Sequence, residues 1–146
     1  MYSILIFIDG TICDTRHRNH LFGTPELDSE NNILGDSPTP GSVEYMRELS
    51  KKFNLIYIGA RPSSLINITK KWLNKAGFPD GDVYLGKNQQ ERMQIATELK
   101  TRNNFIAGIG DRWDDNELHL AIGCRSFILK EYEPNWDTIR KYLLKK

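Results

Sequence analysis

The chain has 146 residues, with 20 Lys and Arg against 19 Asp and Glu, which gives a formal net charge of +1. This length suits one domain with a hydrophobic core, and the balanced charge excludes a protein that binds nucleic acid or membrane through its overall field. Cys13 and Cys124 lie far apart and form neither a disulfide framework nor a metal-binding pattern. With no signal-peptide pattern and no apolar run of membrane-spanning length, we expect one cytoplasmic domain over residues 1–146 that does not bind membranes.

Short apolar runs alternate with helix-length amphipathic segments along the chain. In chain order, strands are expected at Ser3–Ile8, Asn54–Ile58, Val83–Leu85, Phe105–Ile109 and Ser126–Leu129. Helices are expected at Pro40–Phe53, Ser63–Ala76, Gln89–Lys100, Asp114–Ile122 and Trp136–Leu144. Because the strand runs are apolar almost throughout rather than alternating, both faces of the sheet should be covered. The pattern therefore predicts an α/β three-layer sandwich around a mostly parallel sheet of five strands.

Residues 16–39 interrupt this alternation. The segment is polar, rich in Asp, Asn, Gly, Pro and Ser, and lacks sustained periodicity. It is too long for an ordinary strand-to-helix connection, so we expect either a functional loop or a mobile flap inserted into the domain. Arg16, His17, Arg18 and His20 form a cationic cluster in it, which is either a phosphate grip over a site or a solvated loop face.

Three predicted strands end in segments with chemically useful side chains. These segments are Asp9–Thr11, Gly59–Arg61 and Gly110–Asp115. In open α/β sheets, sites form at the carboxyl ends of the strands, so we expect the three segments to converge. Carboxylates from two strand ends would form the oxygen-rich site that Mg²⁺ prefers, and without a cation they would repel one another. Alone, each segment could instead be a turn or a helix cap.

The run LIFIDGTICDTRHRNHL resembles the first motif of the haloacid-dehalogenase-like superfamily, a hydrophobic strand followed by D-x-D-G-T and a further acidic residue. The residues that match in register are Asp9, Gly10, Thr11, Ile12 and Asp14. The run GIGDRWDD resembles the fourth motif of the superfamily, with Asp111 and Asp115 matching and Asp114 as the alternative second member.

Other segments resemble one subgroup, the 3′-phosphatase domain of polynucleotide kinase and its phage and bacterial relatives. They are TRHRNHL after the first motif, ARP after the second strand, and Thr69 with Trp72-Leu73 in the following helix. The resemblance implies a Rossmann-like sandwich in which the strands, numbered in chain order, lie in the order 5-4-1-2-3. It also implies that residues 16–39 stand in place of a full cap domain, which would leave the site open.

The resemblance further implies a Mg²⁺-dependent phosphatase that forms an aspartyl-phosphate. By position, Asp9 would be the acid/base, Asp111 the metal ligand and Asp115 a supporting carboxylate, so the candidate metal set is Asp9, Asp111 and Asp115. The other candidate catalytic residues are Thr11 and Arg92, and the candidate substrate-binding residues are Gly10, Arg16, Arg18, Gly59, Ala60, Arg61 and Lys87. The expected partner is a phosphorylated small molecule, such as a nucleotide, or a 3′-phosphorylated nucleic-acid end.

The sequence departs from the family pattern at three key positions. The nucleophilic aspartate is replaced by Phe7, whose phenyl ring can neither attack phosphorus nor bind Mg²⁺. The Thr or Ser that normally grips the phosphoryl oxygens is replaced by Gly59, and the third-motif lysine falls on Arg92, with Lys87 as the other candidate. An arginine could still hold a phosphate, and would do so with two hydrogen bonds.

These departures leave several hypotheses open. The chain is either a phosphohydrolase with an altered constellation or a catalytically impaired descendant that binds a phosphorylated ligand or a protein partner. A purely structural role has no positive support in the sequence. A shifted register would make Asp9 the nucleophile with Thr11 in the second aspartate's place, although Asp14 fits the unshifted register. Loss of a single residue from the sequence would also explain Phe7.

Overall fold

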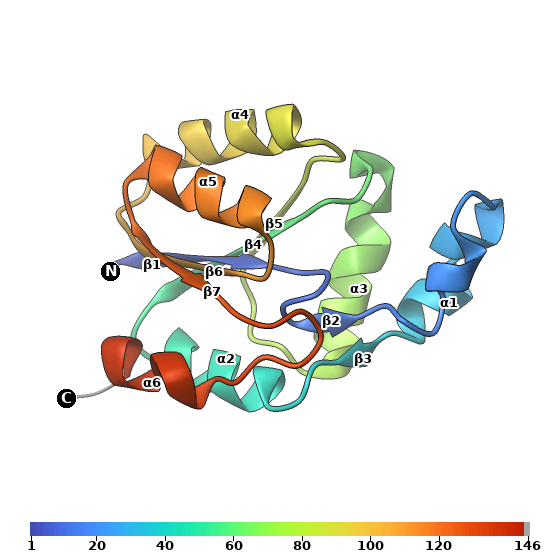
Figure 1. Ribbon diagram of the computed structural model, residues 1–146, viewed down its shortest axis with the longest axis horizontal. Coiled ribbons are helices and arrows are strands. Elements are labelled where there is room, and N and C mark those ends of the chain that lie inside the picture. The colour runs from blue at the N-terminus through green and yellow to red at the C-terminus, as the bar shows by residue number, and fades with distance from the viewer. Residues whose placement is uncertain (145–146) are drawn as a thin grey trace.

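A sheet of five strands forms the middle layer of the computed structural model, which describes residues 1–144 (Figure 1). Its strands are β1 (Ser3–Phe7), β4 (Asn54–Gly59), β5 (Asp82–Leu85), β6 (Phe105–Gly110) and β7 (Arg125–Ile128). They lie in the order β5-β4-β1-β6-β7, and each neighbouring pair is parallel. Numbered along the chain and read from the β7 edge, this is the order 5-4-1-2-3. The predicted fold class is therefore confirmed.

Helices cover both faces of the sheet. Those in the outer layers are α2 (Ser42–Ser50), α3 (Ile66–Ala76), α4 (Gln89–Lys100), α5 (Trp113–Ile122) and α6 (Asp137–Leu143). In Figure 1, α4 and α5 lie above the sheet and α2 and α6 lie below it, while α3 stands upright at the right. Trp72 and Leu73 of α3 belong to the same core cluster as Met46 of α2. Gly77 and Gly123 end α3 and α5 in the left-handed conformation, with φ of 94° and 73°, as C-terminal caps do. Within residues 1–144, no helix combines the length and apolar character needed to cross a membrane.

The segment 16–39 contains more regular structure than its aperiodic sequence predicts. It holds two 3₁₀ turns, Asn19–Leu21 and Pro25–Asp28, and the short helix α1 (Glu30–Leu34). A two-stranded antiparallel ladder joins β2 (Cys13–Asp14) to β3 (Ser37–Pro38) at its base. These elements escape prediction because each is too short to show a period. Helix α1 has five residues, and only one of them, Ile33, is buried.

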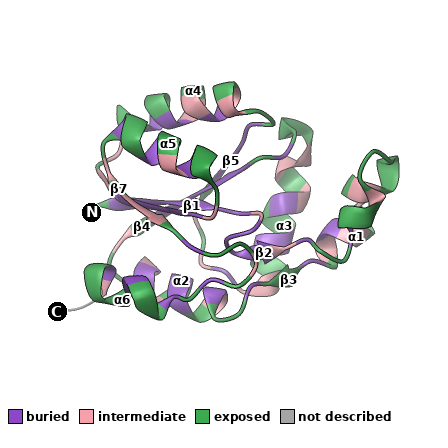
Figure 2. Ribbon diagram, viewed as in Figure 1, coloured by how far each residue is buried: buried purple, intermediate pink, exposed green. Residues whose placement is uncertain are grey.

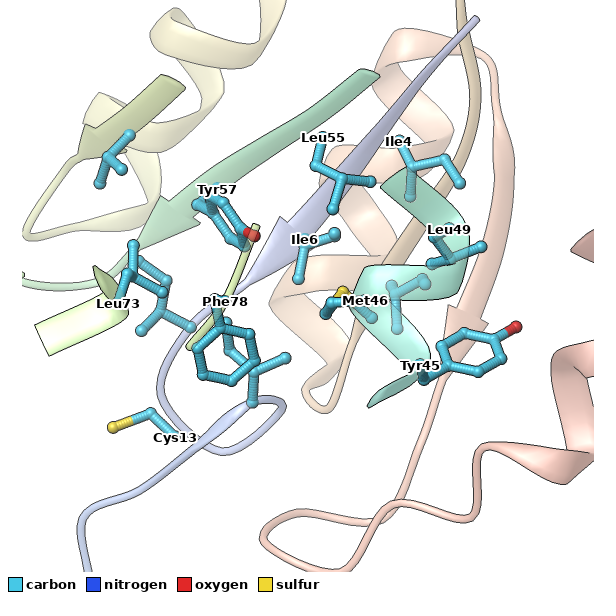
Figure 3. Close-up of a cluster of buried hydrophobic side chains, with 14 of the residues drawn as sticks. Ile4, Ile6, Cys13, Tyr45, Met46, Leu49, Leu55, Tyr57, Leu73 and Phe78 are labelled. Atoms are coloured by element: carbon cyan, nitrogen blue, oxygen red, sulfur yellow. The ribbon is translucent and has the colours of Figure 1, made fainter. Parts of the chain in front are cut away.

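Alternate residues of β1 enter two separate cores, one on each face of the sheet. Ile4 and Ile6 pack below it with Met46 of α2, in the cluster drawn in Figure 3. Leu5 and Phe7 belong to a smaller cluster that packs against α4 and α5. Figure 2 shows β1 buried along its length, which explains why the run is apolar throughout instead of alternating.

Truncation of the central strand should test this core. Ile6 is fully buried, so Ile6→Ala should lower the free energy of unfolding by about 2–5 kcal/mol through lost burial and the cavity left behind. The matched control is Ile128→Ala, because Ile128 is 39% exposed on the edge strand β7 and should cost less than about 1 kcal/mol. Urea unfolding measures both, and equal losses would contradict the burial pattern.

Candidate functional site

A cavity of about 470 Å³ opens at the carboxyl ends of β1 and β4, between the sheet and the segment 16–39. Among the predicted site residues, its walls include Asp9, Arg18, Gly59, Ala60, Arg61, Arg92 and Asp115. The segment 16–39 also contributes Phe22 and Leu27, and the loop after β7 contributes Tyr132. The predicted convergence of strand ends is thus present, with the inserted segment as one wall.

Arg61 and Asp9 form a two-pronged ion pair at the cavity wall. Arg61 Nε donates to Asp9 Oδ2 at 3.1 Å, and Nη2 donates to Oδ1 at 2.7 Å. Nη1 donates to Thr69 Oγ1 at 2.9 Å, so the guanidinium is held on both sides. Burial raises the pKa of Asp9, but the charge and hydrogen bonds of Arg61 outweigh burial and hold the pKa below its ordinary value. Asp9 is therefore a stable carboxylate rather than a proton donor.

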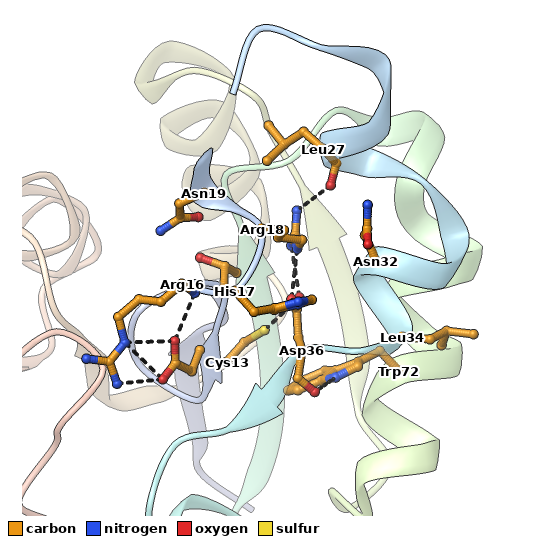
Figure 4. A network of polar contacts seen from close by, with 12 residues as sticks. Cys13, Arg16, His17, Arg18, Asn19, Leu27, Asn32, Leu34, Asp36 and Trp72 are labelled. Carbon is orange, nitrogen blue, oxygen red and sulfur yellow. Dashed lines mark hydrogen bonds and ion pairs between the residues drawn. The ribbon is translucent and has the colours of Figure 1, made fainter. Parts of the chain in front are cut away.

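Asp36, which the sequence did not single out, is the centre of the buried polar network in Figure 4. Arg18 donates to its carboxylate through Nε at 2.8 Å and Nη2 at 2.9 Å, and His17 Nε2 lies 2.7 Å from Oδ1. Cys13 Sγ donates to Oδ2 at 3.2 Å, while Trp72 Nε1 donates to the backbone carbonyl at 2.9 Å. The network connects the inserted segment to Trp72 of α3 and to Cys13, just after Asp9–Thr11 of the first motif. A lone Asp in an aperiodic polar segment gives no sequence signal of this role.

The predicted cationic cluster is divided by the structure. Arg18 is buried and lines the cavity, whereas the Arg16 side chain is 54% exposed and pairs with Asp14 at 2.7 Å. The Arg16 guanidinium also lies 4.9 Å from the centre of the Tyr132 ring. Arg16 is outside the cavity lining, so of these two arginines only Arg18 faces a ligand there.

Thr11 and Gly10 both lie against the Asp111 carboxylate. Thr11 Oγ1 donates to Asp111 Oδ1 at 2.8 Å, while Oδ2 is buried without a hydrogen-bond partner among the described residues. Burial raises the pKa of Asp111 to about 7. Gly10 has φ of 90°, and a Cβ there would lie 2.3 Å from Asp111 Oδ2. Glycine is required at this position because the backbone approaches the carboxylate so closely.

Asp115 caps the start of α5. Its Oδ2 accepts hydrogen bonds from the backbone N–H groups of Asp111 at 2.9 Å and Arg112 at 3.1 Å. Burial raises the pKa of Asp115 despite these bonds. Asp114, the alternative acid, is half exposed and lies 4.0 Å from Arg92. Asp115 is the member of the acidic pair that lines the cavity.

Of the two third-motif candidates, Arg92 lies in the cavity wall and Lys87 does not. Arg92 is buried, and its Nη1 donates to the Gly86 carbonyl at 2.8 Å. Its Nη2 donates to Gln89 Oε1 at 3.2 Å. Lys87 is exposed just before α4. Within this conformation, Arg92 is thus the cation available to the cavity from this part of the chain.

Apolar groups fill the two places where the family carries nucleophile and hydroxyl. Phe7 is 4% exposed at the cavity floor, and its ring meets His119 edge-on with centroids 5.6 Å apart. A Cβ on Gly59 would lie 3.0 Å from Leu85 Cδ2 and 3.3 Å from Ile8 Cδ1. The neighbours have therefore packed into the space that a larger side chain would need.

His119 is a second buried polar residue that the sequence did not single out. It is fully buried in α5, with Nδ1 2.7 Å from Ser126 Oγ and Nε2 without a partner in the described part of the chain. Burial lowers the pKa of His119 to about 4. The ring lies against Gly108, where a Cβ would be 2.1 Å from His119 Cδ2. The neutral imidazole supports Phe7 from behind.

The predicted magnesium ligands do not fit a magnesium site. Within residues 1–144, no three His, Cys, Asp or Glu side chains are grouped to hold one metal ion. Asp9 is committed to Arg61, Asp115 to two backbone amides, and Phe7 offers no oxygen. Asp111 alone keeps a buried oxygen without a partner. The predicted set Asp9, Asp111 and Asp115 is therefore not assembled as one centre.

Comparison with known proteins yields a partial sequence relative. No protein-family model matches the chain. Over 72 residues the chain is 37% identical to a Bacillus cereus protein named "Putative nucleotidase", a match that covers 47% of this chain and 38% of the relative. The matched region is thus well under half of that protein.

Solved structures share the fold across most of the chain. The Pnkp1/Rnl/Hen1 RNA repair complex contains a chain that matches with a TM-score of 0.69 and 14% identity, covering 89% of this chain and 42% of that one. A haloacid dehalogenase-like family protein from Streptococcus pneumoniae matches with a TM-score of 0.67 and 14% identity, covering 96% and 90%. An enzyme of the same fold from Bacteroides thetaiotaomicron was solved with magnesium and inorganic phosphate. It matches with a TM-score of 0.62 and 11% identity, covering 95% of this chain and 98% of that one.

The fold is that of haloacid-dehalogenase-like hydrolases, as the first motif predicts. Magnesium and phosphate belong to the Bacteroides structure and are not carried over to this chain by fold alone.

The Arg61–Asp9 pair should contribute strongly to stability. Arg61→Met keeps most of the side-chain volume but leaves Asp9 without its cation, so the free energy of unfolding should fall by about 3–5 kcal/mol. Adding Asp9→Asn removes the unpaired charge and should recover part of the loss. A double-mutant cycle from urea unfolding measures the coupling energy between Arg61 and Asp9. Strictly additive losses of unfolding free energy in the double variant would contradict the ion pair.

His119 should give stability a specific pH dependence. Its folded-state pKa is about 4, below the ordinary value of 6.5, so the unfolded chain takes up a proton first as the pH falls. Stability from this residue should be complete above pH 6.5 and should fall by roughly 3 kcal/mol toward pH 4.

His119→Gln isolates this effect from the other groups that titrate in the same range. The stability that wild type has over the variant, measured as the difference in their unfolding free energies, should decrease as the pH falls from 7 to 4. The exposed His20→Gln should leave the wild-type profile intact. An identical profile for His119→Gln would contradict the burial of a neutral imidazole.

Proposed function

We propose that this protein binds a phosphomonoester in the cavity and does not hydrolyse it by way of an aspartyl-phosphate. The observation that carries the proposal is Phe7, a buried phenyl ring at the cavity floor where the family pattern has its nucleophile. Gly59, packed against Leu85 and Ile8, removes the hydroxyl that would grip a transferring phosphoryl group. Both replacements remove groups that would take part in phosphoryl transfer, whereas the cavity that would hold the ligand is present.

The charges and size of the cavity support a phosphorylated ligand. Its charged lining comprises Arg18, Arg61, Arg92 and Arg112 against Asp9, Asp28 and Asp115. The excess is positive, and guanidinium groups suit phosphate oxygens because they donate two parallel hydrogen bonds. A volume of about 470 Å³ lies in the range of small-ligand sites. The likeness to a protein named as a nucleotidase supports a nucleotide as the ligand class. The alternative of a 3′-phosphorylated nucleic-acid end rests on the resemblance of TRHRNHL and ARP to the 3′-phosphatase subgroup.

A phosphohydrolase that uses Asp9 as acid/base with Mg²⁺ is the second candidate. It is favoured by the place of Asp9 in the cavity wall and by the Thr11–Asp111 bond, which preserve half of the motif set. With its pKa held low by Arg61, Asp9 would accept a proton more readily than it donates one. Under this candidate, magnesium would supply charge compensation for the departing phosphate, and Asp111 would hold it.

A phosphate-release assay separates the two candidates. Purified protein with Mg²⁺ is given a generic aryl phosphate, nucleoside monophosphates and a 3′-phosphorylated oligonucleotide. We expect no release above that of the Asp9→Asn control, because the route through a covalent intermediate has lost its nucleophile. Release that Asp9→Asn abolishes would establish the second candidate and end the first.

Ligand binding should depend on Arg112. This side chain is half exposed at the cavity and its ion pair with Glu131 is long, at 3.9 Å, so Arg112→Gln should leave the fold intact. Loss of the cation should weaken binding of the same phosphorylated ligands about three- to tenfold by calorimetry. Arg102→Gln is the matched control, since Arg102 is equally exposed but pairs with Glu98 on α4, outside the cavity lining. Equal affinities for the two variants would argue against this cavity as the binding site.

A further inference from the structure

We infer that the cavity binds its phosphate-bearing ligand without a divalent cation, and that the Arg61 guanidinium is the resident charge that replaces one. The inference rests on the proposed function, because it concerns the way in which the same cavity compensates a phosphate. Its basis is that both side-chain oxygens of Asp9, and one oxygen each of Asp111 and Asp115, already accept hydrogen bonds from donors of the chain itself.

The first commitment is that of Asp9. Both of its side-chain oxygens accept hydrogen bonds from Arg61, at 2.7 and 3.1 Å, so the carboxylate already has a cationic partner. Arg61 is fixed in turn by Thr69 at 2.9 Å and lies 3.5 Å from Asp36 Oδ2. A guanidinium that is 4% exposed and held by several acceptors does not swing away to admit a metal ion.

One oxygen of each of the other two predicted ligands is also committed. Asp115 Oδ2 closes on the backbone amides at the start of α5, at 2.9 and 3.1 Å, and Asp111 Oδ1 accepts from Thr11 at 2.8 Å. The single oxygen of Asp111 that has no partner among residues 1–144 cannot hold a divalent cation alone, because Mg²⁺ takes six oxygens in near-octahedral geometry.

Phe7 removes the last support for a cation. Its ring lines the same cavity as Asp9, two residues along the chain, where a metal ion would need either an oxygen ligand or room for its water. A phenyl ring provides neither, and an ion placed against it would lose hydration without a substitute. The same ring leaves an anion undisturbed, provided that the arginines reach the phosphate oxygens.

Asp9 then competes with the ligand for the same guanidinium. In the cavity wall, the carboxylate takes the two parallel donors that a phosphate would use. Phosphate binding must therefore weaken the Asp9–Arg61 contact or proceed beside it, against the negative charge of Asp9. Removing the charge of Asp9 should therefore tighten phosphate binding. Removing a residue that held a metal ion would weaken it.

The first test is a calorimetric titration of the wild-type protein with inorganic phosphate, in EDTA and in millimolar Mg²⁺. We expect equal dissociation constants within twofold, and no heat of binding when Mg²⁺ alone is titrated. Binding that becomes tenfold tighter with Mg²⁺, or saturable Mg²⁺ binding to the free protein, would overturn the inference and leave the proposed function standing. Absence of phosphate binding in both buffers, with the phosphorylated ligands above also failing to bind, would overturn the proposed function and the inference together.

The second test is the sign of the Asp9→Asn effect. Removing the competing charge should tighten phosphate binding in EDTA by about three- to tenfold. Asp137→Asn is the matched control, because Asp137 is an exposed carboxylate on α6 that pairs with Arg140 at 3.6 Å, outside the cavity lining. It should change the affinity by less than twofold. Weaker binding for Asp9→Asn in Mg²⁺ but not in EDTA would mean that Asp9 supports a metal ion, and would refute the inference.

Discussion

The ion pair between Arg61 and Asp9 is the interaction on which the rest of the site depends. It joins the end of β1 to the end of β4, and through Asp36 it reaches the inserted segment that forms the opposite wall. Two buried arginines and two carboxylates meet within this network, so the charges nearly cancel where water is excluded. Such an arrangement is costly to open from one side only, because any single loss leaves a buried charge without its partner.

This balance also explains why the inserted segment is ordered. The sequence between 16 and 39 lacks the apolar period that would hold it to the domain, yet Arg18 and Asp36 are buried with 5% and 6% exposure. Ion pairs and the Trp72 hydrogen bond add to the apolar contact of Ile33, which is buried in the main core. The segment thus lies against the domain as one wall of the cavity.

The fold could be predicted because its signals are local and repeated. Uninterrupted apolar runs mark strands such as Ser3–Phe7, and Gly77 and Gly123 mark helix ends, so the parallel sheet follows from alternation and handedness, while its strand order came from the family resemblance. The convergence of the strand ends followed from the same rules. The partners of each charged group did not, since Arg61 could equally have faced a ligand, and only packing places it on Asp9.

Asp36 and His119 show the limit of sequence reasoning most clearly. Each is a single polar residue with no motif around it. The hydrogen-bond partners of Asp36 lie 18 or more residues away in the sequence, and His119 is buried against Ser126 and Phe7. The magnesium prediction assumed that neighbouring carboxylates repel one another unless a cation is bound. It omitted the possibility that an arginine of the chain supplies the compensating charge.

The packing around Phe7 and Gly59 has an evolutionary consequence. His119 meets the Phe7 ring edge-on, and Leu85 and Ile8 lie against Gly59, so each neighbour is packed to the residue at that position. A carboxylate introduced at position 7 would lie beside a neutral imidazole in an apolar cluster, while a side chain added at position 59 would require Leu85 and Ile8 to shift. Single substitutions at these positions therefore pass through less stable variants, which favours retention of the present residues.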